Sequence, residues 1–106
     1  MFRFLSLCVA FSLSGAPGFA VDLEAGKKLA RKCSSCHGKD GIGRDPEMPN
    51  LAGQSAFYLE KAIKDFQTGA REDRRMTLIV KSLSDEDVKN LAAWFASFKV
   101  TVEPPE

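Results

Sequence analysis

The stretch Cys33-Ser-Ser-Cys36-His37 is the most informative part of this sequence. Its two thiols are three residues apart, and the imidazole follows the second thiol directly. The stretch ends a segment, residues 22–35, in which apolar residues recur every three or four positions, so we predict a helix there. Two thiols with this spacing at a helix end can reach one edge of a bound group, while the histidine turns toward the centre of that group.

The spacing C-x-x-C-H is the sequence signature of covalent c-type haem attachment. In this interpretation Cys33 and Cys36 form thioethers with the two vinyl groups on one porphyrin edge, and His37 binds the iron. We therefore expect one covalently attached haem c per chain.

Three other interpretations of the motif stay open. A redox-active dithiol of the thioredoxin type is expected near a βαβ pattern, and this sequence has no strand series. A structural zinc site needs four ligands, whereas the chain has three Cys and one His, and one of the Cys lies in the N-terminal apolar stretch. A plain disulfide in an exported domain would leave the histidine incidental.

Residues 1–20, MFRFLSLCVAFSLSGAPGFA, have the pattern of a secretory signal peptide. A basic residue, Arg3, precedes a short apolar centre, and the small residues Gly18 and Ala20 fit cleavage after Ala20. A retained anchor is the alternative, although the apolar centre falls short of the roughly 20 residues that a spanning helix needs. We predict a cleaved signal over 1–20, one domain over 21–106 and a periplasmic location.

The composition fits one small globular domain. The 106 residues carry 15 Lys plus Arg and 14 Asp plus Glu, a net charge of +1, which provides no basic surface for nucleic acid. Removal of residues 1–20 leaves 86 residues, from 106 minus 20, with two Cys, one His and two Met. A core of this size is thin, and such domains often recruit a disulfide, a metal or a cofactor.

Helical patterns continue beyond the motif, so we predict an all-α fold. A second helix spans residues 55–68, with Ser55 as its cap and Gly69 as its stop. A third spans residues 85–98, where Ser84 is followed three positions later by an acid.

The segments between these helices are less regular. Residues 38–54 have the Gly, Pro, Asp and Asn content of a loop. Residues 76–83 fit either a short helix or an extended run, because several of them are β-branched. The tail from residue 100 lacks a helical pattern.

The single histidine excludes two histidine ligands to one iron within this chain. Methionine is an established partner of histidine at haem iron, and its thioether raises the reduction potential. Met48 lies in the 38–54 loop just before Pro49, whereas Met76 lies beyond the second helix, where the chain can fold over the opposite face of a haem. The residues favour Met76 and leave Met48 open, because any methionine can simply fill a core.

Taken together, these residues resemble the class I c-type cytochromes, of the small soluble bacterial monohaem type whose domain also occurs duplicated in dihaem cytochromes. The resemblance covers residues 22–98: the C-x-x-C-H motif, Pro49-Asn-Leu-Ala-Gly-Gln, the Tyr58-Leu helix, a Met before Ser84-Asp-Glu-Asp and an aromatic last helix. It implies a class I cytochrome c fold, with three to four helices around one covalently bound haem.

The resemblance also implies roles for individual residues. A proline carbonyl before an Asn-Leu pair accepts a hydrogen bond from the iron-binding histidine in that family, which assigns this contact to Pro49 and His37 and orients the ring. The position of the methionine ligand in that family implies that Met76, rather than Met48, is the second axial ligand.

The first and last helices of the family cross where a small residue meets an aromatic one. Gly26 with Trp94 or Phe95 can form that pair here. Two interpretations of the surface near the haem edge stay open. Basic residues such as Arg71 and Arg75 could form a basic rim, or the acids that alternate with them could make this surface mixed and solvated.

The expected function is one-electron transfer by a periplasmic carrier between respiratory or photosynthetic redox partners, with no catalytic residue. Its partners would be donor and acceptor oxidoreductases, with membranes approached only through transient docking. The alternative is a haem c electron-accepting subunit of a periplasmic dehydrogenase, such as a flavoprotein. In a third possibility Met76 does not bind the iron, so that the sixth coordination position is open and the protein binds a small ligand or reacts with peroxide.

Overall fold

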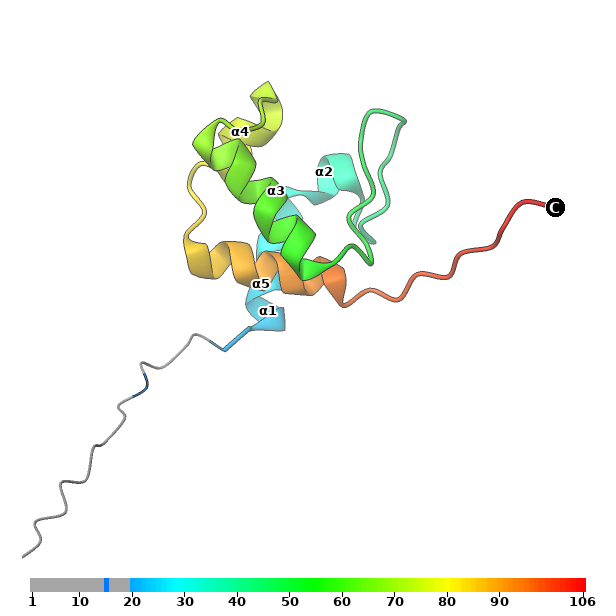
Figure 1. The fold of residues 1–106 in the computed structure, drawn as a ribbon, viewed down its shortest axis with the longest axis horizontal. Coiled ribbons are helices and arrows are strands. Elements are labelled where there is room, and N and C mark those ends of the chain that lie inside the picture. Colours follow the sequence, from blue (N-terminus) through cyan, green and yellow to red (C-terminus); the bar gives the residue numbers. More distant parts are fainter. Residues whose placement is uncertain (1–14, 16–19) are drawn as a thin grey trace, which may run out of the picture.

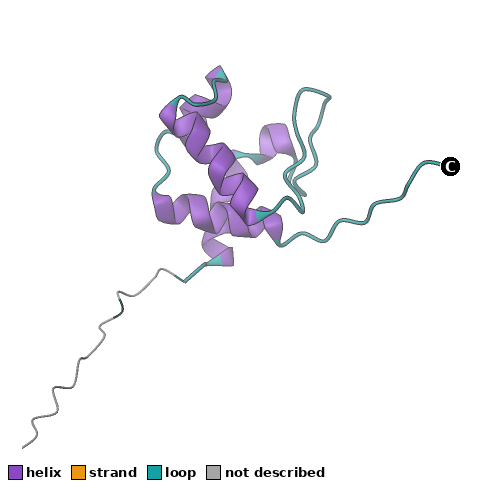
Figure 2. Cartoon of the chain, viewed as in Figure 1, coloured by secondary structure: helices purple, strands orange, loops and turns teal. Residues whose placement is uncertain are grey.

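The computed structural model describes residue 15 and residues 20–106, and within them all regular secondary structure is helical (Figures 1 and 2). The all-α prediction is confirmed. The predicted signal peptide lies almost wholly outside the described residues. In the part of the chain that is described, no helix has both the length and the apolar character needed to cross a membrane. The elements are α1 (Leu23–Leu29), a 3-10 turn (Ala30–Lys32), α2 (Ser34–His37), α3 (Ala56–Thr68), α4 (Arg74–Val80) and α5 (Asp85–Ala96).

The segment predicted as one helix over 22–35 is divided into α1, the 3-10 turn and α2. The Cys33 amide donates to Ala30 O at 3.0 Å, which tightens the backbone to a three-residue step. The Ser34 hydroxyl donates to Arg31 O at 2.9 Å and competes with the regular helical ladder. The spacing of apolar residues does not predict this break in the helix. Because of the break, most of the Cys33–His37 motif lies in a separate short helix, α2.

Helices α3 and α5 begin where their caps predict. The Ser55 hydroxyl accepts from the Tyr58 amide, and Gly69 ends α3 with a left-handed φ of 83°. Ser84 and Asp87 form a reciprocal capping box at the start of α5. Helix α5 ends at Ala96, two residues before the predicted end.

Residues 74–80 are helical, which resolves the choice left open for the segment around Met76. The Asp73 carboxylate accepts from the amides of Arg75 at 2.9 Å and Met76 at 3.0 Å. This cap satisfies two amides that have no partner within the helix. The side-chain cap thus starts a helix although the segment is rich in β-branched residues.

Helix α5 is the centre of the packing, because α1 and α3 both lie against it while α4 contacts α3 (Figure 1). The closest approach is at Gly26, where an added Cβ would lie 2.1 Å from Asn90 O and 2.9 Å from Trp94 Cβ. Trp94 is therefore the aromatic residue at this crossing, and Phe95 lies in the core. The buried core cluster comprises Ala30, Leu59, Leu91, Ala92 and Phe95.

Candidate functional site

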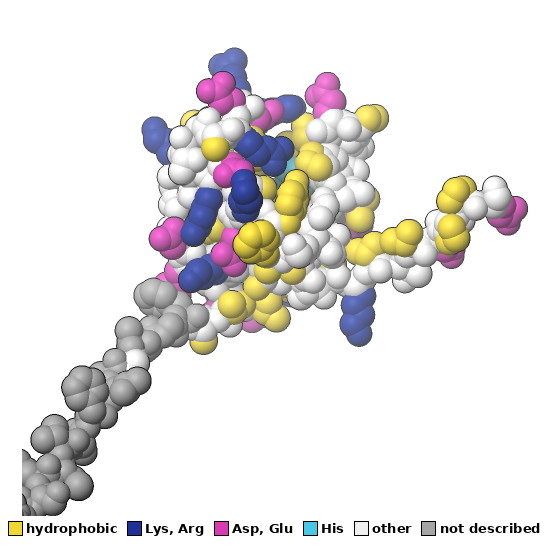
Figure 3. Space-filling model, in the orientation of Figure 1, with side chains coloured by type: hydrophobic (Ala, Val, Ile, Leu, Met, Phe, Trp, Pro, Cys, Tyr) yellow, Lys and Arg dark blue, Asp and Glu magenta, His cyan; other side chains and the backbone are white. Residues whose placement is uncertain are grey.

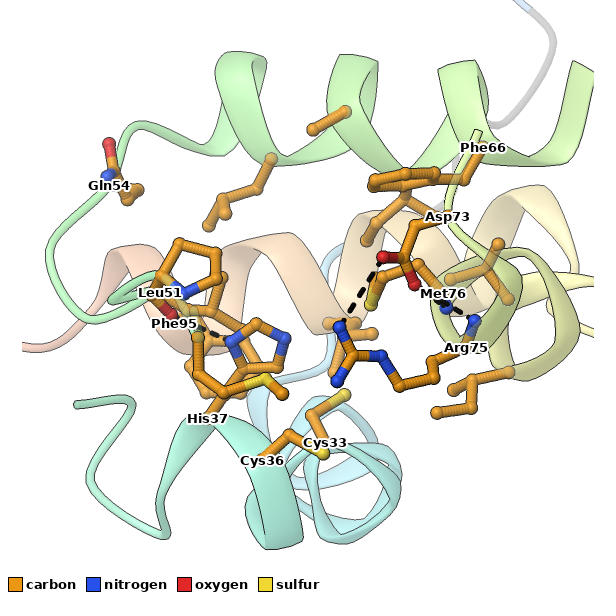
Figure 4. Close-up of a pocket in the computed structure, with 18 of the residues that line it drawn as sticks. Cys33, Cys36, His37, Leu51, Gln54, Phe66, Asp73, Arg75, Met76 and Phe95 are labelled. Atoms are coloured by element: carbon orange, nitrogen blue, oxygen red, sulfur yellow. Dashed lines mark hydrogen bonds and ion pairs between the residues drawn. The ribbon is translucent and has the colours of Figure 1, made fainter. Parts of the chain in front are cut away.

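One cavity of about 590 Å³ collects every residue that the sequence singled out as a site residue. Its lining includes Cys33, Cys36 and His37 from the motif, Met48 and Pro49 from the loop, and Met76 from α4. Apolar side chains of α3 and α5 complete the walls (Figure 4). Cys33 and Met76, which are 43 positions apart in the sequence, thus line the same mainly apolar cavity.

The imidazole of His37 is held in a defined orientation. The side chain is only 5% exposed, and its Nδ1 lies 2.7 Å from Pro49 O. A carbonyl oxygen only accepts hydrogen bonds, so Nδ1 carries the proton and donates. In the neutral ring, Nε2 then has a free lone pair. No buried side-chain nitrogen in the described residues lacks a partner, so Nε2 must face the open cavity.

Hydrogen bonds within the loop fix the position of Pro49. The carbonyl of Gly41 accepts from the amides of Leu51 at 2.7 Å and Ala52 at 3.0 Å. The Gly43 amide donates to Asn50 Oδ1 at 2.7 Å. These contacts tie the three residues after Pro49 to Gly41 and Gly43, so the carbonyl of Pro49 is oriented by the fold of the loop and not by an adjacent helix.

The two cysteines are half-buried free thiols at the same wall of the cavity. Burial raises the pKa of the Cys33 thiol to about 11, while the charge of Lys32 opposes that rise and Cys36 adds to it. A thiol that stays protonated at neutral pH lacks the lowered pKa of a thioredoxin-type nucleophile. Within residues 20–106 no three Cys, His, Asp or Glu side chains are grouped closely enough to hold a metal ion.

Met48 and Met76 are both half-buried and both line the cavity. They differ in the wall to which they belong. Met48 adjoins Pro49, the residue that holds His37. Met76 comes from α4, and Figure 4 places it across the cavity from His37. A group bound between these walls would therefore have His37 on one side and Met76 on the other.

Charged side chains of both signs surround the mouth of the cavity. Arg75 lies 3.6 Å from Asp73 and 3.9 Å from Glu47, which are loose, exposed ion pairs. Arg71 stacks over the buried ring of Phe66, 4.6 Å from its centroid. On the face shown in Figure 3, basic and acidic side chains are interspersed beside an apolar strip. The rim is mixed rather than uniformly basic.

The roles of two residues near the site were not predicted from the sequence. No helix start was predicted at Asp73, although an Asp before apolar residues at positions 76, 79 and 80 is a signal for a helix cap. The hydrogen bond from the Met76 amide, followed by contacts with Arg75, lowers the pKa of Asp73. Gln67 bonds to the far end of α4, a contact between distant segments that leaves no local signal.

The chemistry of this lining fits a covalently attached haem. The cavity volume falls within the roughly 300–1,000 Å³ of sites that enclose small molecules and cofactors. Two thiols on one wall can form thioethers, and the free nitrogen of His37 can bind iron. The remaining lining is mainly apolar, which suits the faces of a porphyrin.

Comparisons with known proteins agree with this site. The family model for cytochrome c matches residues 23–99. The chain is 41% identical to cytochrome c4 of Pseudomonas aeruginosa over 92% of its own length and 49% of the relative. It is 44% identical to cytochrome c-554(548) of Halomonas halodenitrificans, covering 74% of this chain and 98% of the relative.

Two further matches extend the comparison. The thiosulfate dehydrogenase electron acceptor of Stutzerimonas stutzeri is 34% identical over 83% of this chain and 42% of the relative. The crystal structure of cytochrome c4 from Pseudomonas stutzeri superimposes with a TM-score of 0.72 at 38% identity, covering 78% of this chain and 48% of that one.

The chain spans about half the length of the cytochrome c4 relatives that it matches. The structural match confirms the predicted class I cytochrome c fold. Residues 33–37 form the C-x-x-C-H site through which this family carries covalently bound haem c. The chain therefore belongs to the cytochrome c family of electron-transfer proteins.

Proposed function

We propose that this chain is a periplasmic one-electron carrier whose haem iron is bound by His37 and Met76. Cys33 and Cys36 would form the thioethers that attach the haem. The observation that carries the proposal is the single cavity with His37 on one wall and Met76 on the opposite wall. The haem supplies the reversible one-electron change at iron, and the protein supplies attachment, ligands and an apolar enclosure.

Pro49 would act through His37. Its carbonyl accepts a hydrogen bond from Nδ1, 2.7 Å away, which fixes the tautomer that leaves Nε2 free and increases the basicity of the ring. Because the bond also limits rotation of the imidazole, the iron ligand would keep one orientation in both oxidation states.

Substitution of the two methionines tests the ligand assignment with a built-in control. Met76→Ala should abolish the thioether-to-iron charge-transfer absorption of the ferric protein, lower the reduction potential and let the ferrous protein bind carbon monoxide rapidly. Met48→Ala removes the same side chain from the same cavity and should leave all three properties nearly unchanged. The reverse pattern would identify Met48 as the ligand, and rapid carbon monoxide binding by the unaltered protein would refute a closed iron site.

Export is a separate part of the proposal. Residues 1–20 have the charge and apolar pattern of a signal peptide, and cleavage after Ala20 would leave Val21 as the first residue. The mass of the haem-containing protein recovered from the periplasm tests this directly. A protein that retains Met1–Ala20 and fractionates with membranes would contradict it.

A second candidate function is that of an electron-accepting subunit in a dehydrogenase complex. It is favoured by the similarity to the thiosulfate dehydrogenase electron acceptor of Stutzerimonas stutzeri. Gel filtration of a native periplasmic extract separates the two candidates. Haem absorbance that elutes with a large protein and is reduced by that protein's substrate would support a subunit, whereas elution as a small free protein would support a carrier.

A further inference from the structure

The side chain of Gln67 extends from α3 to the far end of α4, where it donates hydrogen bonds to two backbone carbonyls. Its Nε2 lies 2.9 Å from Val80 O and 2.9 Å from Leu83 O, which are 13 and 16 residues away in sequence. The side chain is half-buried and lies outside the lining of the haem cavity. Both amide hydrogens of Gln67 are therefore used to join α3 to the turn between α4 and α5.

These carbonyls lie where a helix leaves its acceptors unpaired. The last carbonyls of an α-helix have no partner within the helix, and they need another donor or water. Val80 is only 2% exposed, so water has little access to this residue. The Leu83 amide donates a hydrogen bond to Val80 O at 3.1 Å, and Gln67 provides a second donor to this carbonyl from outside the turn.

Helix α4 depends on contacts at its two ends. It has seven residues, of which only Val80 is buried, while Leu78 is 74% exposed. A helix this short does not persist on its own propensity. Asp73 secures its first turn, and Gln67 together with buried Val80 secures its last. Met76 lies between these two attachments.

We propose that Gln67 is a positioning residue for the axial ligand Met76. Its two bonds would fix α4 at the place from which the thioether reaches the iron. This inference rests on the proposed function, in which Met76 is the second ligand. Loss of both bonds should increase detachment of Met76 by about tenfold, since each neutral hydrogen bond changes an equilibrium by a factor of about two to ten.

The test compares Gln67→Leu and Gln67→Glu with a control, Asn90→Ala, in the haem-loaded protein. Leucine keeps much of the side-chain volume without donors, and glutamate places an acceptor against two carbonyls. Asn90 also makes a long-range bond to a backbone group, accepting from the Asp22 amide at 2.9 Å, but it joins α5 to the start of α1. The measurements are carbon monoxide binding by the ferrous protein, hydrogen exchange of the α4 amides and thermal stability.

We expect Gln67→Leu to accelerate both carbon monoxide binding and α4 exchange about tenfold, and Gln67→Glu to accelerate them further. Asn90→Ala should lower the melting temperature while it leaves both rates within about twofold of the unaltered protein. Rates for Gln67→Leu within that same range would overturn the proposal and leave Gln67 a purely structural residue. If Met76→Ala does not accelerate carbon monoxide binding, the ligand assignment itself fails, and α4 exchange alone decides whether Gln67 fixes the helix.

Discussion

Replacement of Gly26 by alanine adds one methyl group where α1 crosses α5. The new Cβ would lie 2.1 Å from Asn90 O, 2.8 Å from Asn90 C and 2.9 Å from Trp94 Cβ. Ordinary contacts begin near 3.4 Å, so the two backbones would have to separate by about 1.3 Å at this point. Two of the three clashing atoms belong to the backbone of α5, so a change of side-chain rotamer cannot relieve the contact.

The magnitude follows from two opposing effects. Overpacking of a well-packed interface costs about 1–3 kcal/mol, and a backbone clash belongs at the upper end of that range. Alanine also favours the helical backbone over glycine by about 1 kcal/mol. The net loss in the free energy of unfolding is therefore about 2 kcal/mol. For a domain of this size it lowers the melting temperature by about 8–16 °C.

Thermal unfolding of the haem-loaded protein, followed by circular dichroism, measures this loss. Gly69→Ala is the matched control, because nothing lies within 4 Å of its added Cβ while its φ of 83° is unfavourable for alanine. That strain costs about 1 kcal/mol, or about 4–8 °C. If Gly26→Ala raised the melting temperature, as helix propensity alone requires, or left it unchanged, the close crossing of α1 and α5 would be refuted.

Three further outcomes are expected. Cys33→Ala or Cys36→Ala should leave haem held by a single thioether, which a lower yield of covalently bound haem after denaturing electrophoresis would reveal; unchanged yields from both variants would contradict attachment at these thiols. Asp73→Ala should increase hydrogen exchange of the α4 amides, because it removes the acceptor of the Arg75 and Met76 amides, whereas Asp85→Ala at an exposed site on α5 should not. The chain expressed without export and haem attachment should stay largely unfolded, and a cooperative melting transition of that apoprotein would disprove the dependence of the core on haem.

The sequence predicted those elements whose signals are local. Ser55 and Gly69 bound α3, and the Ser84 capping box begins α5, because caps depend on residues within one turn. The Cys33–His37 motif was informative for the same reason, since its spacing is itself the geometry of attachment. The family match and the structure then agreed with an all-α fold built around that motif.

The remaining features depend on contacts between distant segments. The division of the first helix at Ala30 follows from hydrogen bonds that apolar spacing does not report. Propensity left the Met76 segment undecided, since its β-branched residues favour strand, whereas Asp73 and Gln67 stabilise a helix there. No local pattern reveals that Gln67 meets Val80 and Leu83, because the packing of α3 against α4 creates that contact.

The thin core explains why attachment and folding should be linked in this chain. An apolar cavity of about 590 Å³ that no side chain fills leaves its walls without packing partners, which costs stability. Small domains are stable by only about 5–15 kcal/mol in total. Among the described residues only eight hydrophobic side chains are buried, so the protein's own core has little to offset that cost. A haem between His37 and Met76 would therefore complete the core as well as carry the electron, and thioethers at Cys33 and Cys36 would keep that part of the core attached even when the chain unfolds.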